Sequence, residues 1–333
     1  MANDALLNAR KQQNDEFYTL YEYIQKEVNA YLEYNPDTFR DKVVLCPCDD
    51  PEWSNFTRYF AQNFERLGLK KLISTSYAVE SKKIRIWQPT LFEMESPYYN
   101  ADKSRTNGKI FVLDKDVNGD SRINIDDLEW QYLDGDGDFR SDEVTVLRDE
   151  ADIIVTNPPF SLFREFLGWI IEANKKFIII GNQNAITYKE VFPLIMENNI
   201  WLGKGFKGGA THFISNYQDY ATAGDHREGM IRVSGVVWFT NLEHGRRHLP
   251  LQLMTMEDNL KYSRHKEIKE YGYQRYYHYE YIEVPYSEAI PNDYTDIMGV
   301  PITFLDSYNP DQFEILGITD RNNQYGLTTK IYT

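Results

Sequence analysis

The sequence predicts an α/β protein built on an open, mostly parallel sheet, followed by a C-terminal region of different character. Short runs rich in Val, Ile and Leu alternate with longer segments of helical periodicity, which is the pattern of βαβ units. Turn residues separate the runs. After about residue 244 the chain becomes rich in tyrosine, arginine and histidine. We therefore expect a large domain over residues 1–244 and a separate region over residues 245–333.

The first part of the chain predicts an N-terminal helix and one βαβ unit. Apolar residues spaced by three and four predict the helix, and Gly68 is expected to end the helix of the βαβ unit. The expected elements are a helix at Asn14–Leu32, a strand at Val43–Cys46, a turn at Pro47–Pro51, a helix at Ser54–Leu67 and a strand at Lys71–Tyr77.

A second βαβ unit is expected further along the chain. Both of its strands are short apolar runs, and a helical pattern lies between them. The expected elements are a strand at Asp152–Thr156, a helix at Ser161–Asn174, a strand at Lys176–Asn182, a helix at Tyr188–Asn198 and a strand at Ser234–Thr240.

The tetrapeptide Asn157-Pro158-Pro159-Phe160 follows directly after the first strand of this second unit. Two prolines cannot continue a ladder of hydrogen bonds, so the chain leaves the sheet here with carbonyl groups able to accept. An exocyclic amino group can donate to the Asn157 side-chain oxygen and the Pro158 carbonyl while Phe160 stacks on the ring that carries it. The alternative is structural, because Asn-Pro-Pro also ends strands without binding anything.

The turn after the first strand offers groups for a nucleotide-like ligand, because open α/β sheets bind ligands at the carboxyl ends of their strands. Carboxylates at Asp49 and Asp50 can accept from ribose hydroxyls or an ammonium group, and Ser54 and Asn55 begin a helix that can hold a carboxylate. S-adenosylmethionine carries all three groups. A simple helix cap with solvated acids is the alternative.

An acidic insertion at residues 114–138 contains a twelve-residue stretch with the spacing of a calcium loop. Oxygen-bearing side chains occupy positions 1, 3, 5, 9 and 12, at Asp116, Asn118, Asp120, Asn124 and Asp127. Ser121 replaces the usual glycine, and Asp127 is shorter than the usual glutamate. The sequence thus leaves calcium binding and a solvated turn as alternatives. At the end of the insertion, the stretch Asp134–Phe139 alternates aspartate and glycine and leaves two alternatives. It is either another cation-binding turn, or a turn whose Asp138 and Phe139 face a ligand, with the acid accepting from an adenine amino group.

The charge and apolar content of the chain limit its class. The net charge is −15, but residues 114–152 carry 14 acidic and 4 basic side chains (−10), whereas residues 201–280 carry 11 basic and 9 acidic ones (+2). The C-terminal part can therefore still meet a phosphate backbone. No apolar run reaches the roughly 18 residues that span a bilayer, and no secretory signal is seen, so we expect a cytoplasmic protein with no membrane partner. Cys46 and Cys48 are expected to be reduced.

A series of motifs resembles the EcoRI-type adenine-specific DNA methyltransferases along nearly the whole chain. It comprises Asn14-Asp15-Glu16-Phe17-Tyr18-Thr19, Cys46-Pro47-Cys48-Asp49-Asp50-Pro51, Gly137-Asp138-Phe139-Arg140-Ser141, the stretch Ala151–Glu165, the stretch Gly181–Tyr188 and Gly299–Leu305. Such an ordered series is far more specific than the tetrapeptide alone.

The resemblance implies a Rossmann-like S-adenosylmethionine-dependent enzyme that methylates N6 of a flipped adenine in double-stranded DNA. Asn157, Pro158, Pro159 and Phe160 would then form the catalytic motif, residues 1–244 the catalytic domain and residues 245–333 the target-recognition region. It assigns cofactor binding to Phe17, Tyr18, Thr19, Pro47, Cys48, Asp49, Asp50, Ser54, Asn55, Asp138 and Phe139. Such an enzyme belongs either to a restriction-modification system, with a restriction endonuclease as functional rather than physical partner, or to an orphan modification system, and the sequence leaves both open.

Two alternatives remain open from the sequence. The same tetrapeptide suits the planar amine of a protein glutamine or of RNA. A calcium-dependent binding module on an inactive methyltransferase fold is the other alternative.

Overall fold

The computed structural model of the chain describes residues 18–49, 54–78, 93–94, 96–206, 209–214, 227, 229–319 and 327. The chain forms two compact units, one made of Met1–Ala185 with Gly203–Glu243 and the other of Ile186–Leu202 with His244–Thr333. The expected division after residue 244 lies one residue from the second junction, but residues 186–202 belong to the second unit. No helix within the described ranges is long and apolar enough to cross a membrane.

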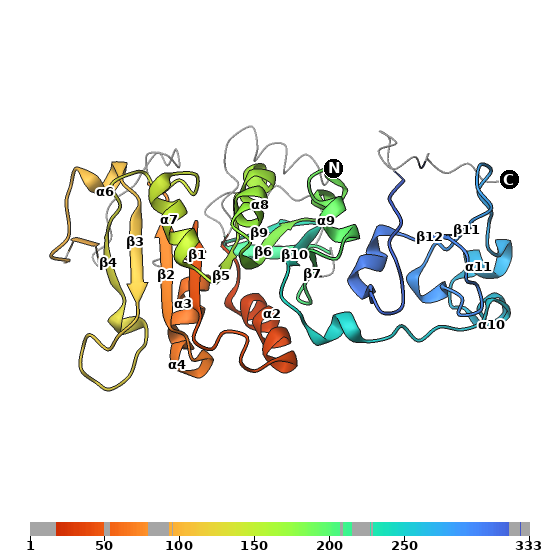
Figure 1. Cartoon of the computed structure of the whole chain (residues 1–333), viewed down its shortest axis with the longest axis horizontal. Coiled ribbons are helices and arrows are strands. Elements are labelled where there is room, and N and C mark those ends of the chain that lie inside the picture. The colour runs from red at the N-terminus through yellow and green to blue at the C-terminus, as the bar shows by residue number, and fades with distance from the viewer. Residues whose placement is uncertain are drawn as a thin grey trace. The chain divides into compact units, whose positions relative to one another are not determined.

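The first unit contains the predicted α/β sheet (Figure 1). Its strands are β1 (Val43–Pro47), β2 (Lys71–Ser76), β3 (Lys109–Leu113), β4 (Glu129–Tyr132), β5 (Ile153–Thr156), β6 (Lys176–Asn182), β8 (Thr211–Ile214), β9 (Met230–Val233) and β10 (Val236–Thr240). Its helices are α2 (Tyr21–Tyr34), α3 (Asn55–Gln62), α4 (Phe64–Leu67), α6 (Lys103–Thr106), α7 (Asp142–Glu150) and α8 (Phe163–Glu172). The strands that the sequence predicts are confirmed, with shifts of one or two residues at some ends.

The strands of the main sheet follow the order β4-β3-β2-β1-β5-β6-β10. β1 pairs in parallel with β2 on one side and β5 on the other, and β5 pairs in parallel with β6. The unit formed by β1, α3, α4 and β2 therefore extends the sheet on one side of β1, and the unit formed by β5, α8 and β6 extends it on the other. Ligands of open α/β sheets bind where the strand order reverses in this way, at the carboxyl ends of the two central strands.

Both faces of the parallel strands are buried. Val44, Cys46 and Val155 belong to a core that also contains Ile24 of α2 and Phe56 of α3. The alternating residues Leu45, Ile154 and Ile179 are fully buried as well. Continuous burial is the expected character of parallel strands with helices on both sides.

Some predicted helices differ from the observed ones. The described end of the N-terminal segment is extended up to Leu20, because Tyr18 pairs with Ile214, and α2 begins only at Tyr21. The expected helix at residues 54–67 is split at Asn63 into α3 and α4, and Gly68 ends it with a left-handed φ of 64° as predicted. The hairpin of β3 and β4 and the helix α7 were not expected.

The second unit has small elements around its own apolar core. These elements are α9 (Phe192–Met196), β7 (Trp201–Leu202), α10 (Met256–Tyr262), α11 (Lys266–Tyr271), β11 (Ile282–Glu283) and β12 (Met298–Gly299). Its core contains Ile268, Ile282, Val284, Ile290 and Phe304. The expected helix at Tyr188–Asn198 is shortened to α9, whose first turn holds Pro193.

Candidate functional site

The carboxyl ends of β1 and β5 meet at the reversal point of the sheet. Leu45 of β1 is paired with Ile154 of β5, so the two strands end side by side. The Thr156 hydroxyl oxygen lies 2.5 Å from the Pro47 carbonyl oxygen and 2.5 Å from Oδ2 of Asp49. These contacts bring the predicted first-strand turn and the predicted amine-binding motif together.

The Asn157–Phe160 motif leaves the sheet as predicted. β5 ends at Thr156, and a 3-10 helix (Phe160–Leu162) leads into α8. Pro158 is buried, whereas Asn157 and Pro159 are partly exposed. Phe160 is 8% exposed and belongs to the core of the first unit. The predicted stacking on a base would therefore have to use the small exposed part of this ring.

The turn after β1 is organised around Asp49. Oδ1 of Asp49 accepts from the Ser54 hydroxyl at 2.6 Å, and its backbone amide donates to the Thr75 carbonyl at 2.9 Å. Ser54 also caps α3 by accepting from the amide of Phe56 at 3.1 Å. Cys48 adopts a left-handed φ of 71°, which turns the chain sharply after Pro47. Asp50 lies outside the described residues.

The N-terminal segment comes to the same place. The Asn55 side-chain amide donates to the Thr19 carbonyl at 2.8 Å, and Tyr18 exchanges two backbone hydrogen bonds with Ile214. Thr19 is 2% exposed, and its hydroxyl oxygen has no hydrogen-bond partner within the described part of the chain. The structure thus brings Thr19 and Asn55 together, while Phe17 lies outside the described residues.

The predicted turn at Asp138 and Phe139 is fixed beside the end of β2. The amide of Ala78 donates to the Asp136 carbonyl at 2.7 Å, and Gly137 approaches the backbone of Ser76 so closely that a Cβ there would lie 2.3 Å from the Ser76 oxygen. Gly137 also has a φ of 82°, which favours glycine.

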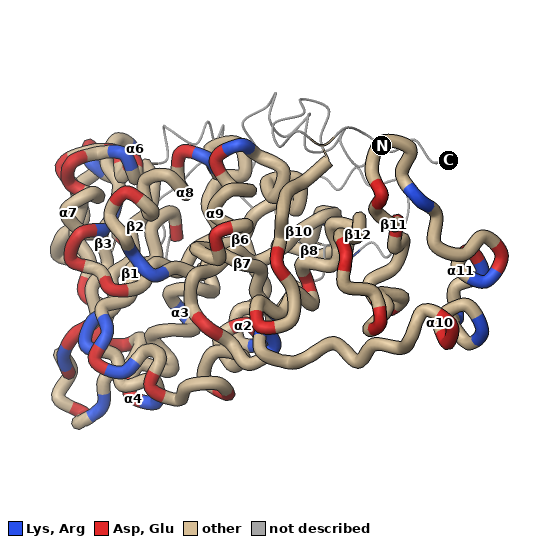
Figure 2. The backbone as a smooth tube through the Cα atoms, turned by 45° about the vertical axis from the view of Figure 1, so that its right-hand side comes forward, with Lys and Arg blue, Asp and Glu red and all other residues tan. Residues whose placement is uncertain are grey.

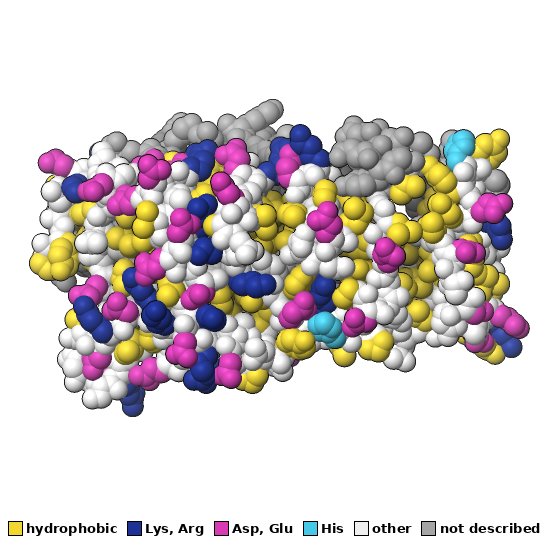
Figure 3. Space-filling model, viewed as in Figure 1, with side chains coloured by type: hydrophobic (Ala, Val, Ile, Leu, Met, Phe, Trp, Pro, Cys, Tyr) yellow, Lys and Arg dark blue, Asp and Glu magenta, His cyan; other side chains and the backbone are white. Residues whose placement is uncertain are grey.

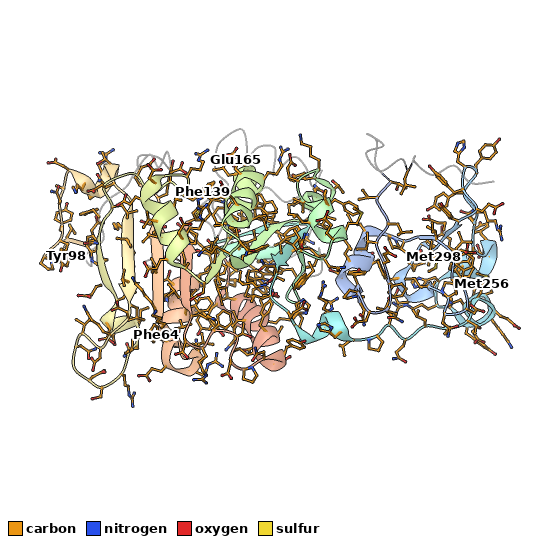
Figure 4. All side chains as sticks on the ribbon, in the orientation of Figure 1. Phe64, Tyr98, Phe139, Glu165, Met256 and Met298 are labelled. Carbon is orange, nitrogen blue, oxygen red and sulfur yellow. The ribbon has the colours of Figure 1, made fainter. Side chains whose placement is uncertain are left out.

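The side chains of this turn are used within the protein. Phe139 is 4% exposed and its ring packs against Phe166 and Trp169 of α8. Asp138 pairs with Arg140 at 2.6 Å, and Arg140 also reaches Glu165 at 3.0 Å. Glu165 lies at the start of α8, where Figure 4 labels it. The Arg140 guanidinium lowers the pKa of Asp138 below its ordinary value. The predicted contact of these two side chains with a ligand remains a prediction.

The calcium prediction is not supported. The described residues, which include Asp116, Asn118, Asp120, Asn124 and Asp127, contain no group of three or more His, Cys, Asp or Glu side chains placed to hold a metal ion. The loop oxygens instead accept from the loop's own backbone.

Hydrogen bonds and apolar contacts account for the shape of this insertion. Asp127 accepts from the amides of Val117, Asn118 and Asn124 at 2.9–3.1 Å, and these bonds lower its pKa. Asp116 accepts from the amides of Gly119 and Ser121 in the same way. The loop also packs Ile123, Ile125 and Leu128 against the core.

Charge is unevenly distributed in the described chain. Figure 2 shows acidic residues along the part of the first unit that contains α6, α7 and β3. On the face drawn in Figure 3, the described Lys and Arg side chains are interspersed with Asp and Glu and form no continuous basic patch. In the tyrosine-rich stretch of the second unit, Tyr271 and Tyr277 are 68% and 64% exposed.

The sequence did not indicate two hydroxyl residues that organise the site. Thr156 joins the ends of β1 and β5, and Ser74 of β2 contacts the Asp49 carbonyl oxygen and accepts from Thr57 at 2.7 Å. Thr156 is the last residue of its predicted strand, which is the available signal, whereas Ser74 lies in the middle of the predicted strand Lys71–Tyr77 and carries no such signal. Cys46 and Cys48 form no disulfide, and burial raises the pKa of the Cys46 thiol.

The comparisons with known proteins agree with this architecture. The family model described as "Adenine-specific methyltransferase EcoRI" matches residues 5–332. The Type II methyltransferase M.EcoRI of Escherichia coli is 43% identical over 94% of this chain and 89% of its own length. The Type II methyltransferase M.MpnI of Mycoplasma pneumoniae is 34% identical over 92% of this chain and 83% of its own.

No solved structure matches the chain. The comparisons support neither a calcium-dependent module nor a methyltransferase for glutamine or RNA. Because the family model covers nearly the whole sequence and the two relatives are 43% and 34% identical to it over the aligned residues, the chain belongs to the EcoRI family of adenine-specific methyltransferases.

Proposed function

We propose that this protein is a site-specific DNA methyltransferase that transfers a methyl group from S-adenosylmethionine to N6 of adenine in double-stranded DNA. One observation carries the proposal beyond family membership. The Asn157–Phe160 motif begins where β5 leaves the sheet, next to the turn after β1 and at the reversal of strand order. An amine held by the motif therefore lies beside the place where such sheets bind a nucleotide-like cofactor.

The described residues around the β1 turn fit the groups of S-adenosylmethionine. Thr19 has a buried hydroxyl with no partner among the described residues, and Thr75, at the end of β2, has another. The N-terminal end of α3, at Ser54 and Asn55, offers amide groups suited to a carboxylate. We assign cofactor binding to this cluster, together with Phe17, Tyr18, Pro47, Cys48, Asp50, Asp138 and Phe139 as predicted from the sequence.

The reaction asks little acid–base chemistry of the protein. S-adenosylmethionine supplies a methyl group on a sulfonium, which leaves without needing a proton. The Asn157 side-chain oxygen would accept a hydrogen bond from one N–H of the adenine amine, and the Pro158 carbonyl would accept one from the other, which orients the nitrogen lone pair for attack. As the N–C bond forms the C–S bond breaks, so the cofactor leaves as a neutral thioether and the methylated nitrogen releases one proton to solvent. Alignment and electrostatic preorganisation of this kind are the main sources of rate in such displacements.

The adenine must leave the duplex to reach Asn157. Flipping a base costs a few kcal/mol, and hydrogen bonds and ring contacts in the pocket offset that cost. Phe160 follows Asn157 by three residues and is the proposed ring contact. We assign recognition of the surrounding sequence to residues 245–333, where exposed tyrosines alternate with basic side chains.

The named relatives are Type II methyltransferases. We therefore propose that a restriction endonuclease of the same sequence specificity is the functional counterpart of this enzyme. Digestion of methylated and unmethylated DNA by that endonuclease would test the pairing.

Expression in a host that lacks adenine methylation tests the function directly. DNA from this host, sequenced by a method that detects N6-methyladenine, should carry the modification at one short sequence and almost nowhere else. DNA without N6-methyladenine, from cells that contain folded protein, would contradict the proposal.

A further inference from the structure

We propose that Thr156 and Asp49 are positioning residues that hold the amine-binding motif in register with the cofactor turn. The inference rests on the proposed function and adds a role that the motif itself does not describe. It concerns residues that act through Asn157 and the α3 end rather than by touching the adenine.

Thr156 ties β5 to β1 at the last residue before the motif. Its hydroxyl lies 2.5 Å from both the Pro47 carbonyl oxygen and Oδ2 of Asp49. A hydroxyl has one proton, so it donates to one of these acceptors at a time. Because Pro47 is the last residue of β1 and Asp49 lies in the turn that follows it, either bond fixes the end of β5 against the end of β1 or its turn.

Asp49 extends the connection to α3. Its second carboxylate oxygen accepts from Ser54, which caps the first turn of that helix. Its backbone is held as well, since its amide donates to Thr75 and its carbonyl oxygen is contacted by Ser74. One buried residue thus joins the end of β1, β2, β5 and the start of α3.

This geometry changes the expected role of Asp49. The sequence suggests a carboxylate that accepts from ribose or ammonium, yet Asp49 is 5% exposed, its Oδ1 accepts from the Ser54 hydroxyl and its Oδ2 lies 2.5 Å from the Thr156 hydroxyl oxygen. A carboxylate held this way sets the distance between two parts of the site. Asn157 follows Thr156 directly, so a shift of Thr156 moves the groups that hold the amine.

The size of the effect follows from the sensitivity of displacement reactions to alignment. Misplacement of a reacting group by about 1 Å can cost roughly 100-fold in rate. Thr156→Val keeps the shape of the side chain and removes the hydroxyl. We expect it to lower the rate of methyl transfer about 10- to 100-fold at saturating S-adenosylmethionine and DNA, while the KM for each changes less than about threefold.

Two variants separate positioning from general loss of stability. Thr156→Ser retains the hydroxyl and should recover the rate to within about threefold of the unmodified protein. Thr240→Val removes another buried hydroxyl of the same sheet, one that donates to the Phe177 carbonyl at 2.8 Å. Thr240→Val should lower the melting temperature about as much as Thr156→Val does, while its rate of methyl transfer stays within about twofold of that of the unmodified protein.

A double-mutant cycle tests the pairing itself. If Asp49 acts through Thr156, the two substitutions remove the same interaction. The rate of the double variant Asp49→Asn with Thr156→Val should then lie within about threefold of the rate of the slower single variant. The reaction uses purified protein, tritium-labelled S-adenosylmethionine and plasmid DNA from a host without adenine methylation. The proposal would be overturned if the rate loss of the double variant were the product of the two single losses. It would also be overturned if Thr156→Val and Thr240→Val reacted at equal rates, or if Thr156→Ser were as slow as Thr156→Val.

Hydrogen exchange provides a readout that does not depend on activity. Peptides covering residues 43–62 should exchange faster in Thr156→Val than in Thr240→Val, because the β1 turn and the start of α3 lose their tie to β5. Equal exchange in the two variants would refute the positioning role. If the unmodified protein transfers no methyl group to DNA, the proposed function fails, and the exchange result still decides this inference.

Discussion

Replacing Gly137 by alanine should destabilise the protein far more than the same change at Gly119. Both glycines have a left-handed φ, 82° and 79°, so both substitutions carry the same backbone strain. They differ in their surroundings. A Cβ on Gly137 would lie 2.3 Å from the Ser76 carbonyl oxygen, whereas a Cβ on Gly119 would have no heavy atom within 4 Å.

The expected magnitudes follow from these two terms. An L-residue in the left-handed region costs roughly 1–2 kcal/mol, and alanine regains roughly 0.4–1 kcal/mol by restricting the unfolded chain. We therefore expect Gly119→Ala to lower the free energy of unfolding by about 1 kcal/mol. At Gly137 the backbone of Ser76 or of the turn must also move, which adds about 1–3 kcal/mol of overpacking. The total for Gly137→Ala is about 2–4 kcal/mol.

Urea denaturation followed by circular dichroism measures the difference. If the unfolding free energy of both variants depends on urea concentration with a similar slope, Gly137→Ala should be half unfolded at a clearly lower urea concentration than Gly119→Ala. Thermal melting should show a further drop of about 2–4 °C for each kcal/mol of difference in a unit of this size. Free energies of unfolding that agree to within about 0.5 kcal/mol would show that the turn before Asp138 and Phe139 is not packed against β2 as described.

Two further predictions concern buried and paired carboxylates. Glu27 of α2 is fully buried and accepts from the amides of Lys204 and Gly205 and from the Tyr31 hydroxyl, so Glu27→Leu should cost about 2–4 kcal/mol in urea denaturation. The exposed Glu33 of the same helix pairs only at the surface with Lys204, so Glu33→Leu should cost less than about 0.5 kcal/mol, and equal costs would contradict the role of Glu27. Asp138→Asn should cost no more than about 1 kcal/mol at pH 7, because its partner Arg140 is half exposed. Since the folded state lowers the pKa of Asp138, this stabilisation is fully present above the ordinary aspartate pKa of about 4 and is lost as the pH falls through the lowered pKa of the folded state; a difference between the two proteins that does not shrink as the pH is lowered would refute this origin.

The sequence predicts the centre of the fold better than its edges. β1, β2, β5 and β6 are apolar runs bounded by turn residues, and burial on both faces makes such strands easy to find. β3 is a mostly buried apolar run at Lys109–Leu113 and was missed although it carries the same signal as the central strands. β4 was missed because Glu129–Tyr132 is half exposed and lies in the acidic insertion. The helix α7 was missed for a related reason, since four of the nine residues in Asp142–Glu150 are acidic and few are buried.

The site was predicted in outline only. The rule that ligands bind at the carboxyl ends of central strands places Asp49 and Asn157 at one edge. It does not reveal the contact between Thr156 and Asp49, which are 107 residues apart in the sequence. The calcium alternative is not supported, and spacing alone does not show whether side-chain oxygens face an ion or their own backbone amides. At Asp116 and Asp127 they bind the amides.

The most direct test of the account is the product formed by the purified protein and by its Asn157→Ala variant. Each is incubated with labelled S-adenosylmethionine and unmethylated DNA, and the digested nucleosides are identified by mass spectrometry. The account predicts that the unmodified protein labels N6-methyladenine alone, and that Asn157→Ala forms less than about 1% as much while its dissociation constant for the cofactor changes less than about threefold. A labelled nucleoside other than N6-methyladenine, or substantial N6-methyladenine from the alanine variant, would contradict the central claim.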